Sequence, residues 1–470
     1  MKIGNSFSTQ NTYYVRFRHN NTISETINSL AHQNQKTIAG EGAILGAAAI
    51  TGIVLVNKGK PDKYIKALAK DLSSILNKKI TPEDLSPVMT KKEFAKIAKS
   101  LKEENYIPNA ENIKKGIFIA DFHSHSNYSD GVTSVKDILE QAKEYGDKLN
   151  KINGKKFLFA LTDHDGIGGV KEALKIIAEN PKRYKNIKFL AGAELSFPLK
   201  CEPNSVKHNS NHNQTEMAEM LIYGINPFSK SSEEYFKTLY QNRKNGVVNS
   251  LKIASEKIPN TKFLEEEYNK FFLINGNNYC MLNQHWRIYQ YINLKTRIAL
   301  LAKEQNKNPE ELYQNIMPEL KKMSHDLNGN VLDRYFNNNN IPIKTKTYLD
   351  EVDALKPDIC PYLSGDKIIA PYESSVEKIS KYAKDENAVL GFAHPGFTVQ
   401  NMTKENAKER IKEFINISEG RLMYSENFHQ AYPIPNNISN EEVKECNELM
   451  KELKLIPIGG RDMHRDNFKL

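Results

Sequence analysis

The stretch Asp121-Phe-His-Ser-His-Ser-Asn-Tyr-Ser-Asp130-Gly131 decides the fold, because it marks the passage from a strand to a helix. Upstream, the apolar run Ile117–Ala120 predicts a buried strand. Downstream, the apolar residues of 135–142 recur with helical spacing. Side chains two residues apart point to the same side of an extended chain. His123 and His125 can therefore chelate a metal ion from the loop between these two elements.

Strand-like runs alternate with helical runs along most of the chain beyond residue 116. The predicted strands are Ile117–Ala120, Phe157–Leu161, Ile187–Gly192, Met220–Tyr223, Val389–Ala393, Leu422–Tyr424 and Leu455–Ile458. This alternation is typical of a parallel sheet with helices outside it, either a barrel or an open doubly wound sheet. The predicted fold class is α/β.

Composition divides the 470 residues into further segments. Residues 1–37 are rich in Asn, Ser, Thr and Gln, and we expect them to be disordered. Residues 61–115 have helical periodicity and predict a small helical extension. Residues 230–370 interrupt the strand–helix rhythm with long polar helical stretches. They predict a mainly helical insertion, a cap or lid, between a first part of the domain at 116–229 and a second part at 371–470.

An apolar segment at 38–60 has two interpretations. Its run Ala43–Val56 is shorter than the roughly 20 residues that a transmembrane helix needs. The segment is either a buried or self-associating helix, or a membrane anchor through 38–56. No secretory signal opens the chain, so we expect a cytoplasmic protein, with N-terminal membrane attachment as the alternative.

Charge and cysteine content narrow the function classes. The net charge of +9 arises mostly from lysine mixed with glutamate, which favours a solvated surface over a dedicated anionic partner. No protein partner is evident from the sequence. The four cysteines show no CxxC pairing, which argues against a disulfide framework and against a thiolate zinc site.

Histidines and carboxylates gather where the predicted strands end, which is where active sites form in barrels and open α/β sheets. In chain order these residues are His123, His125, Asp130, Asp163, His164, Asp165, Glu194, His394, Glu426, Asp462 and His464. A single histidine after a strand is more often a cap or a core residue. Five of the twelve histidines at strand ends, beside carboxylates, favour a metal centre instead.

The chemistry of these residues indicates which ions would bind. Imidazole and carboxylate ligands without thiolate suit Mn, Zn, Fe or Mg. The number of ligands exceeds the needs of one ion, so two or three divalent metal ions are expected. Glu194, with two carboxylate oxygens, is a natural bridge between them. Clustered ions activate water and hold a phosphoryl or acyl group.

Together these motifs resemble the PHP family, named for polymerase and histidinol phosphatase. The matching pieces are Asp121-Phe-His123-Ser-His125 with Ser129-Asp130-Gly131, Leu161-Thr-Asp-His164-Asp165, Gly192-Ala-Glu194, Ala393-His394-Pro395 and Asp462-Met-His464. They occur in the order of the family, within 116–225 and 371–470. The resemblance implies a distorted (β/α)7 barrel with a trinuclear metal site.

The resemblance also implies how the ligands divide among three ions. The first ion would take His123, His125, Glu194 and Asp462. The second would share Glu194 and add His394, and the third would take Asp130, His164 and His464. Asp130 is similar to the residue in the branch that includes nucleotide and oligoribonucleotide phosphoesterases, where an inserted domain lies over the site.

The chain departs from the family at one ligand position. Where the family has a histidine before the strand Met220–Tyr223, this chain has Glu219. A glutamate ligand would favour Mn, Fe or Mg over Zn. Alternatively, His208 or His212 fills this place, or both belong to a solvated loop.

Other residues are expected to support the site rather than to bind the ions. Asp163 and Asp165 flank His164 and are candidates to orient the imidazoles. Arg461 is the predicted cation for a phosphate group, with Arg243 and Arg297 as weaker candidates.

The predicted function is that of a metal-dependent phosphoesterase. A metal-activated water would hydrolyse a small phosphomonoester, a nucleotide or a short oligonucleotide, with Asp462, Glu194 and Arg461 as the catalytic residues. One alternative is a PHP phosphatase acting on histidinol phosphate, phosphotyrosine or a DNA 3′ end. The other is a non-catalytic binding module in which metals only stabilise the fold. The nearly complete set of ligand residues favours the enzyme.

Overall fold

The computed structural model describes residues 62–129, 131, 133–200, 215–242, 298–299, 301–303, 305–323, 334–335, 338–340, 374–396, 404–429 and 440–464. Several predictions fall on residues outside this set. They concern the disordered segment 1–37, the apolar run Ala43–Val56 and the site candidates Asp130, His208, His212, Arg243 and Arg297. Within the described part, no helix is both long and apolar enough to cross a bilayer.

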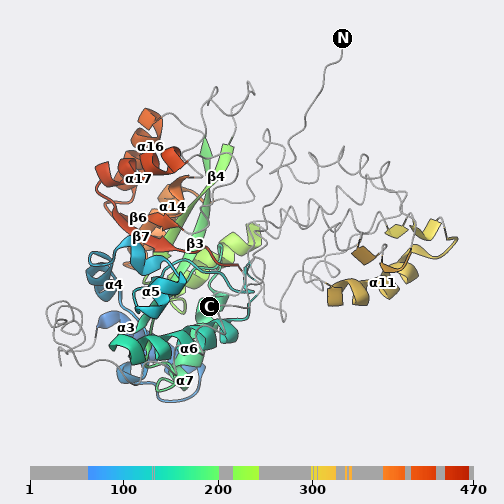
Figure 1. Ribbon diagram of the computed structural model, residues 1–470, viewed down its shortest axis with the longest axis horizontal. Helices are drawn as coiled ribbons and strands as arrows, with labels where there is room; N and C mark the ends of the chain where they lie inside the picture. Colours follow the sequence, from blue (N-terminus) through green and yellow to red (C-terminus); the bar gives the residue numbers. More distant parts are fainter. Residues whose placement is uncertain are drawn as a thin grey trace, which may run out of the picture.

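Seven strands form one sheet whose spatial order follows the sequence. They are β1 (Ala120–Asp121), β2 (Phe157–Leu161), β3 (Ile187–Lys200), β4 (Thr215–Tyr223), β5 (Val389–Phe392), β6 (Leu422–His429) and β7 (Ile456–Gly460). The two edges also meet, since the Phe122 amide donates to the Gly459 carbonyl at 3.1 Å and the His125 amide to Met463 at 3.0 Å. The sheet therefore nearly closes into a barrel, which confirms the predicted α/β barrel (Figure 1).

One strand runs against the others. β4 is antiparallel to both β3 and β5, whereas the remaining neighbours in the sheet are parallel. The prediction of a parallel sheet is therefore wrong at this strand. A parallel connection needs a crossover of about a dozen or more residues, usually a helix. The polar segment 201–214 between β3 and β4 has no helical apolar period. β3 also continues past its predicted end at Gly192, so that the pair forms a long ribbon (Figure 1).

Helices cover the outside of the barrel and bury one apolar face each. They are α6 (Val135–Asn153), α7 (Gly168–Glu179), α14 (Val376–Asp385), α16 (Lys404–Ile417) and α17 (Asn440–Glu452). α6 shows why they form: Ser134 caps its first turn by accepting from the Asp137 amide at 3.2 Å. Gly154 ends it in the left-handed conformation, with φ of 72°.

The predicted N-terminal extension is helical and belongs to the same core. Its elements are α3 (Lys63–Ile75), η1 (Pro82–Leu85), α4 (Lys91–Ala98), η2 (Glu103–Tyr106) and α5 (Ala110–Lys114). Phe94 of α4 lies 5.0 Å from Phe122, 5.0 Å from Tyr223 and 4.8 Å from Tyr424, between ring centroids. These three rings come from different parts of the sheet. The extension therefore packs into the barrel, which periodicity alone did not indicate.

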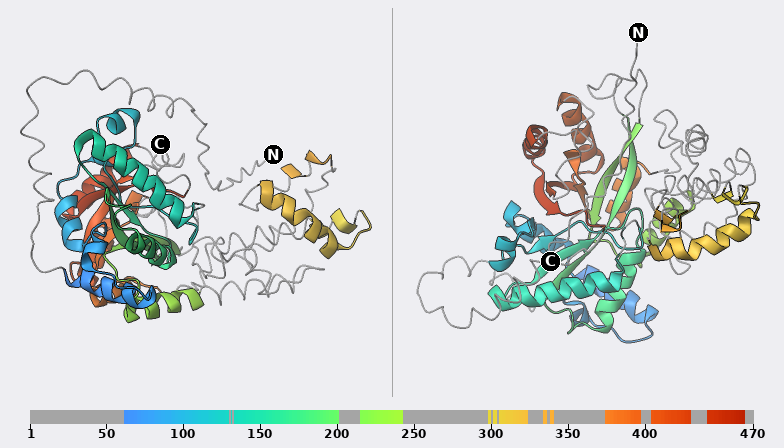
Figure 2. Two further views of the ribbon diagram at one scale, coloured as in Figure 1. Left: turned by 90° about the horizontal axis from the view of Figure 1, so that it is seen from below. Right: turned by 45° about the vertical axis from the view of Figure 1, so that its right-hand side comes forward.

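The predicted insertion is described only in part. A helix over 230–242 follows β4, and α11 (Pro309–Met323) lies within the segment predicted as the helical insertion. Figures 1 and 2 show α11 apart from the helices that surround the sheet. The role of the insertion as a cap or lid stays a prediction.

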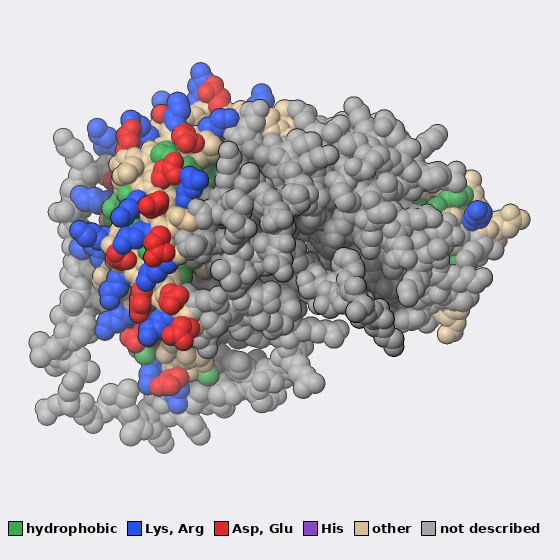
Figure 3. Space-filling view, turned by 90° about the horizontal axis from the view of Figure 1, so that it is seen from above, with side chains coloured by type: hydrophobic (Ala, Val, Ile, Leu, Met, Phe, Trp, Pro, Cys, Tyr) green, Lys and Arg blue, Asp and Glu red, His purple; other side chains and the backbone are tan. Residues whose placement is uncertain are grey.

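The described surface carries charges of both signs. On the face seen in Figure 3, lysines and arginines are interspersed with aspartates and glutamates. Pairs such as Lys384 Nζ with Glu419 Oε1, 2.7 Å apart, join the two signs. This agrees with the solvated, lysine-rich surface predicted from composition.

We expect Phe94→Ala to lower the free energy of unfolding by about 3–5 kcal/mol, because it empties the centre of an aromatic cluster. Urea denaturation followed by circular dichroism measures the loss. Ile75→Ala is the matched control, since Ile75 is 46% exposed and its truncation should change stability by about 0.5 kcal/mol or less. A loss at Phe94 as small as that of the control would show that the N-terminal helices do not stabilise the barrel.

Candidate metal centre

The predicted ligands converge at one end of the barrel. His123 and His125 follow β1, His164 follows β2, His394 follows β5, and Asp462 and His464 follow β7. Two glutamates reach the same place from inside strands. Glu194 lies within the extended β3, where it pairs with His164. Glu219 lies within β4, opposite Ser196. β4 runs antiparallel to its neighbours. The part of β4 that lies at this end of the barrel is therefore not its carboxyl end, and Glu219 comes before the last residues of the strand.

A first group of ligand atoms joins His123, His125, Glu194 and Asp462. His123 Nε2 lies 3.0 Å from His125 Nε2 and 3.0 Å from Glu194 Oε2. Asp462 Oδ1 lies 2.9 Å from His125 Nε2 and 3.4 Å from His123 Nε2. Atoms at about 2.0–2.1 Å from a tetrahedral ion lie about 3.3 Å from one another. The spacing of this group therefore fits a divalent cation.

Glu194 connects this group to a second one through its other oxygen. Glu194 Oε1 lies 3.0 Å from His394 Nε2, which lies 3.1 Å from Glu219 Oε2. Glu219 Oε1 is buried, and among the described residues it has no hydrogen-bond partner. A buried carboxylate oxygen without a hydrogen bond is costly unless positive charge compensates it. The second group thus also fits a metal ion.

His164 stands beside both glutamates. Its Nδ1 lies 3.2 Å from Glu194 Oε2 and 3.5 Å from Glu219 Oε1. The resemblance assigned His164 to a third ion, with Asp130 and His464. In the structure His164 lies close to Glu194, which belongs to both ligand groups, and to Glu219 of the second group. Its imidazole therefore lies between two candidate ion positions.

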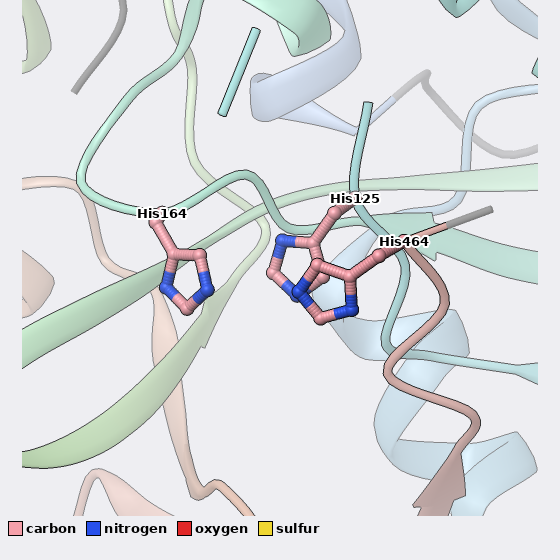
Figure 4. Close-up of side chains that lie close together, drawn as sticks. All are labelled: His125, His164 and His464. Carbon is pink, nitrogen blue, oxygen red and sulfur yellow. The ribbon is translucent and has the colours of Figure 1, made fainter. Parts of the chain in front are cut away.

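Three imidazoles form the third group, His125, His164 and His464, shown in Figure 4. The rings of His125 and His164 lie 4.5 Å apart between centroids, as do those of His125 and His464. They extend from three separate loops towards a common space (Figure 4). Asp130, predicted as a ligand of the same ion, lies outside the described residues, so its place in this group stays a prediction.

The electrostatics of the site favour cations. Burial lowers the pKa of His123, but Glu194, Glu426 and Asp462 outweigh this and raise its pKa well above the usual range. Burial likewise lowers the pKa of His394, and Glu194 and Glu219 together raise it well above the usual range. The imidazoles hold the pKa of Glu194 well below its usual range, against the effect of its burial. Positive charge is thus stabilised here, whether protons or metal ions supply it.

Glu426 orients the first group, a role that the sequence did not assign. Both of its oxygens lie 3.0 Å from His123 Nδ1, and Oε2 accepts from the His394 amide at 3.0 Å. A carboxylate on one imidazole nitrogen fixes the ring so that the other nitrogen faces a metal. Its place at the end of a predicted strand was the signal available in the sequence.

The two aspartates beside His164 accept hydrogen bonds from backbone and hydroxyl groups. Asp163 Oδ1 accepts from the Ser126 amide at 2.7 Å and from the Ser129 hydroxyl at 2.9 Å. Burial raises the pKa of Asp163, and the bond from the Ser126 amide opposes this. Asp165 Oδ1 accepts from the Ser196 amide at 3.0 Å. Both carboxylates therefore hold the loop that carries His125 and the strand that carries Glu194.

Three residues at strand ends adopt backbone conformations that L-residues rarely take. Their φ angles are 43° at Asp165, 23° at His394 and 48° at Asp462. A non-glycine residue in such a conformation costs on the order of 1–3 kcal/mol and is found mainly at functional sites. All three residues lie just after strands, in the loops that carry candidate ligands.

Arg461 lies in a different environment from the one predicted for a phosphate-binding residue. Its side chain is 6% exposed, and its Nε donates to Asp121 Oδ2 at 2.6 Å. Its predicted contact with a substrate stays a prediction.

The fold and the site together define an α/β-barrel protein with clustered metal-ligand groups at the carboxyl end of its strands. The model of the PHP domain family matches residues 121–356, which is half of the chain. The chain belongs to the PHP domain family. The match ends before His394 and Asp462, yet the structure places the strands that precede them in the same sheet.

Two solved structures are similar to the chain, with low sequence identity. One is a candidate metal-dependent phosphoesterase from Bifidobacterium adolescentis, with 15% identity, a TM-score of 0.39, and coverage of 74% of this chain and 88% of that one. The other is an amidohydrolase from Chromobacterium violaceum with bound sulfate and no metal, with 16% identity, a TM-score of 0.41 and the same coverage. No curated protein matches the chain.

Divalent ions should stabilise the folded chain, because they bind the native ligand groups and not the unfolded chain. A free ion concentration 100 times the Kd adds about 2.7 kcal/mol per site. Thermal unfolding of chelator-treated protein, with and without added Mn²⁺, measures this. The variant Glu194→Gln should lose most of the shift, since it removes the charge shared by two groups. An equal shift in both proteins would place the ions elsewhere.

Glu219 should determine which ion the second group prefers. Glu219→His replaces a carboxylate by an imidazole and should raise the bound Zn-to-Mn ratio, because nitrogen ligands suit Zn better. Glu219→Gln should lower Mn affinity without that change in preference. Elemental analysis after equilibration with equal Zn and Mn provides the measurement. A ratio unchanged in Glu219→His would mean that Glu219 is not a ligand.

Proposed function

We propose that this protein is a metal-dependent phosphoesterase that hydrolyses a small phosphomonoester, a nucleotide or a short oligonucleotide. The membership in the PHP domain family and the clustered ligand groups support a hydrolase of this kind. The choice of substrate rests on the resemblance at Asp130.

The observation that carries the proposal is the shared carboxylate of Glu194. Its Oε2 faces His123 at 3.0 Å, while its Oε1 faces His394 at 3.0 Å. One carboxylate between two groups of ligand atoms would hold two ions close to each other. Paired ions, about 3.5–4 Å apart, are the arrangement that enzymes use for in-line displacement at phosphorus.

Buried charge supports two or three ions. Six buried carboxylates lie in or beside the strand ends of the site, namely Asp121, Asp163, Asp165, Glu194, Glu219 and Glu426. With Asp462 included and Arg461 balancing one charge, six negative charges remain when all are ionised. Buried charges need compensation, and two or three divalent ions carry charge of that size.

Bound divalent ions would supply an activated water and neutralise charge on the phosphoryl oxygens. The residues of the chain provide the geometry. His123, His125, Glu194 and Asp462 would hold one ion, and Glu194, Glu219 and His394 a second. His164 and His464 would contribute to a third. Glu426 keeps His123 Nε2 directed into the site.

A covalent cysteine mechanism has no support in the described part of the chain. Cys446 is buried there, and burial raises the pKa of its thiol to about 12. A thiol with such a pKa is not a nucleophile at neutral pH. The inert Cys446 thiol is consistent with water as the nucleophile.

Activity should depend on Mn²⁺ and on the shared ligand. We expect reconstituted protein to hydrolyse p-nitrophenyl phosphate or a nucleoside 3′,5′-bisphosphate. Glu194→Gln and His123→Ala should lower kcat/KM by at least about 100-fold, since even residues that only orient ligands contribute 10–100-fold. Lys384→Gln, which breaks an exposed ion pair, is the control and should retain activity.

A panel with histidinol phosphate, phosphotyrosine, mononucleotides and short oligonucleotides ranks the substrates by kcat/KM. If metal-loaded wild type hydrolyses no phosphoester in the panel, the phosphoesterase proposal is rejected. A metal-dependent rise in unfolding temperature without turnover would instead identify a non-catalytic binding module.

A further inference from the structure

The two edges of the sheet, β1 and β7, are joined by a buried ion pair. Asp121 is the last residue of β1 and is fully buried, and Arg461 directly follows β7. We call the line where these two edges meet the seam. Backbone hydrogen bonds that cross it run from the Phe122 amide to Gly459 and from the His125 amide to Met463. The pair therefore lies where the barrel closes.

The Asp121 carboxylate contacts both loops that leave this seam. Its Oδ2 accepts from Arg461 Nε at 2.6 Å. Its Oδ1 accepts from two backbone amides, that of Arg461 at 3.2 Å and that of His123 at 3.3 Å. One side chain thus fixes the backbone just before Asp462 and at His123. These are the residues that bring the two loops into the first ligand group.

Close packing holds the loops at this distance. A Cβ atom on Gly460 would lie only 2.2 Å from the His123 Cβ atom, so the backbone of β7 approaches His123 as no larger residue would allow. The guanidinium carbon of Arg461 lies 5.5 Å from the Phe118 ring centroid, so a cation–π contact adds to the bond with Asp121.

We propose that Asp121 and Arg461 are positioning residues that set the separation of His123 and His125 from Asp462, and thereby the affinity of the first ligand group for its ion. This inference rests on the proposed function only for the presence of ions in the site. It gives Arg461 a role that its burial and its bond to Asp121 support directly. This positioning role differs from the role predicted from the sequence, in which Arg461 would contact a substrate phosphate directly.

The geometry of the bond matters as well as its charge. An arginine presents several N–H donors in a rigid planar fork, whereas a lysine is a flexible point charge. Arg461→Lys therefore keeps the charge beside Asp121 but loses the Nε donor at its present place. A positioning role predicts that lysine fails to restore metal binding, whereas a role in charge balance alone predicts that it does.

The experiment measures Co²⁺ binding to the metal-free full chain, with no substrate present. We expect Arg461→Met and Arg461→Lys to weaken binding of the most tightly held ion by about 10–100-fold and to change the visible spectrum of bound Co²⁺. Asp121→Asn should have a similar effect, because it keeps an acceptor for the two amides but loses the ion pair. Circular dichroism and thermal unfolding establish that each variant is folded.

Arg183→Met is the matched control. Arg183 Nε donates to Glu140 Oε1 at 2.8 Å, the same kind of bond, but on the exposed outer side of the barrel. It should leave the Co²⁺ spectrum and affinity as in the wild type.

Two outcomes overturn the inference. One is a lowered unfolding temperature in the Arg461 variants with unchanged Co²⁺ affinity and spectrum, which would indicate a purely structural pair. The other is unchanged Co²⁺ binding with a raised KM for the phosphoester, which would make Arg461 a substrate contact. Wild-type protein that binds Co²⁺ but hydrolyses nothing would reject the proposed function and leave the positioning role standing.

Discussion

The rest of this structure depends on one constraint, the concentration of negative charge among buried side chains at one end of the barrel. Six buried carboxylates surround the end of the barrel, and Arg461 is the only lysine or arginine among the buried described residues. Such charge is unfavourable unless cations or protons compensate it. The raised pKa values of His123 and His394 are the response of the chain itself to this field. The same field would bind divalent ions in place of those protons.

The barrel is what makes this concentration of charge structurally tolerable. The candidate ligands come from six of the seven strands or from the loops after them, so the repulsion is shared among many backbone anchors instead of one loop. The anchors are themselves held by hydrogen bonds: Glu426 to His123, Asp163 to Ser126, and Asp121 to Arg461. Phe94 and the rings around it provide apolar burial that stabilises the sheet.

Local sequence predicted elements well where one face or both faces are apolar. The run Phe157–Leu161 is fully buried and is a strand with the predicted bounds. β3 was predicted too short, because beyond Gly192 it continues through Glu194 and Ser196, and polar residues do not look like a buried strand. β4 was predicted to be parallel to its neighbours but is antiparallel. The residues of a strand do not by themselves specify which neighbour it pairs with or in which direction.

The sequence alone determined the α/β class and the residues that stand at its strand ends, because apolar periodicity and residue order are local properties. The choice of a barrel over an open sheet came from the resemblance of the motifs to the PHP family. It also placed Glu219 among the candidates. Only the tertiary structure decided how these residues group: that Glu194 divides its oxygens between His123 and His394, and that Glu426 orients His123. It also decided that Arg461 binds Asp121. These contacts join residues up to 340 positions apart, and their distances depend on how the sheet closes, which no local pattern encodes.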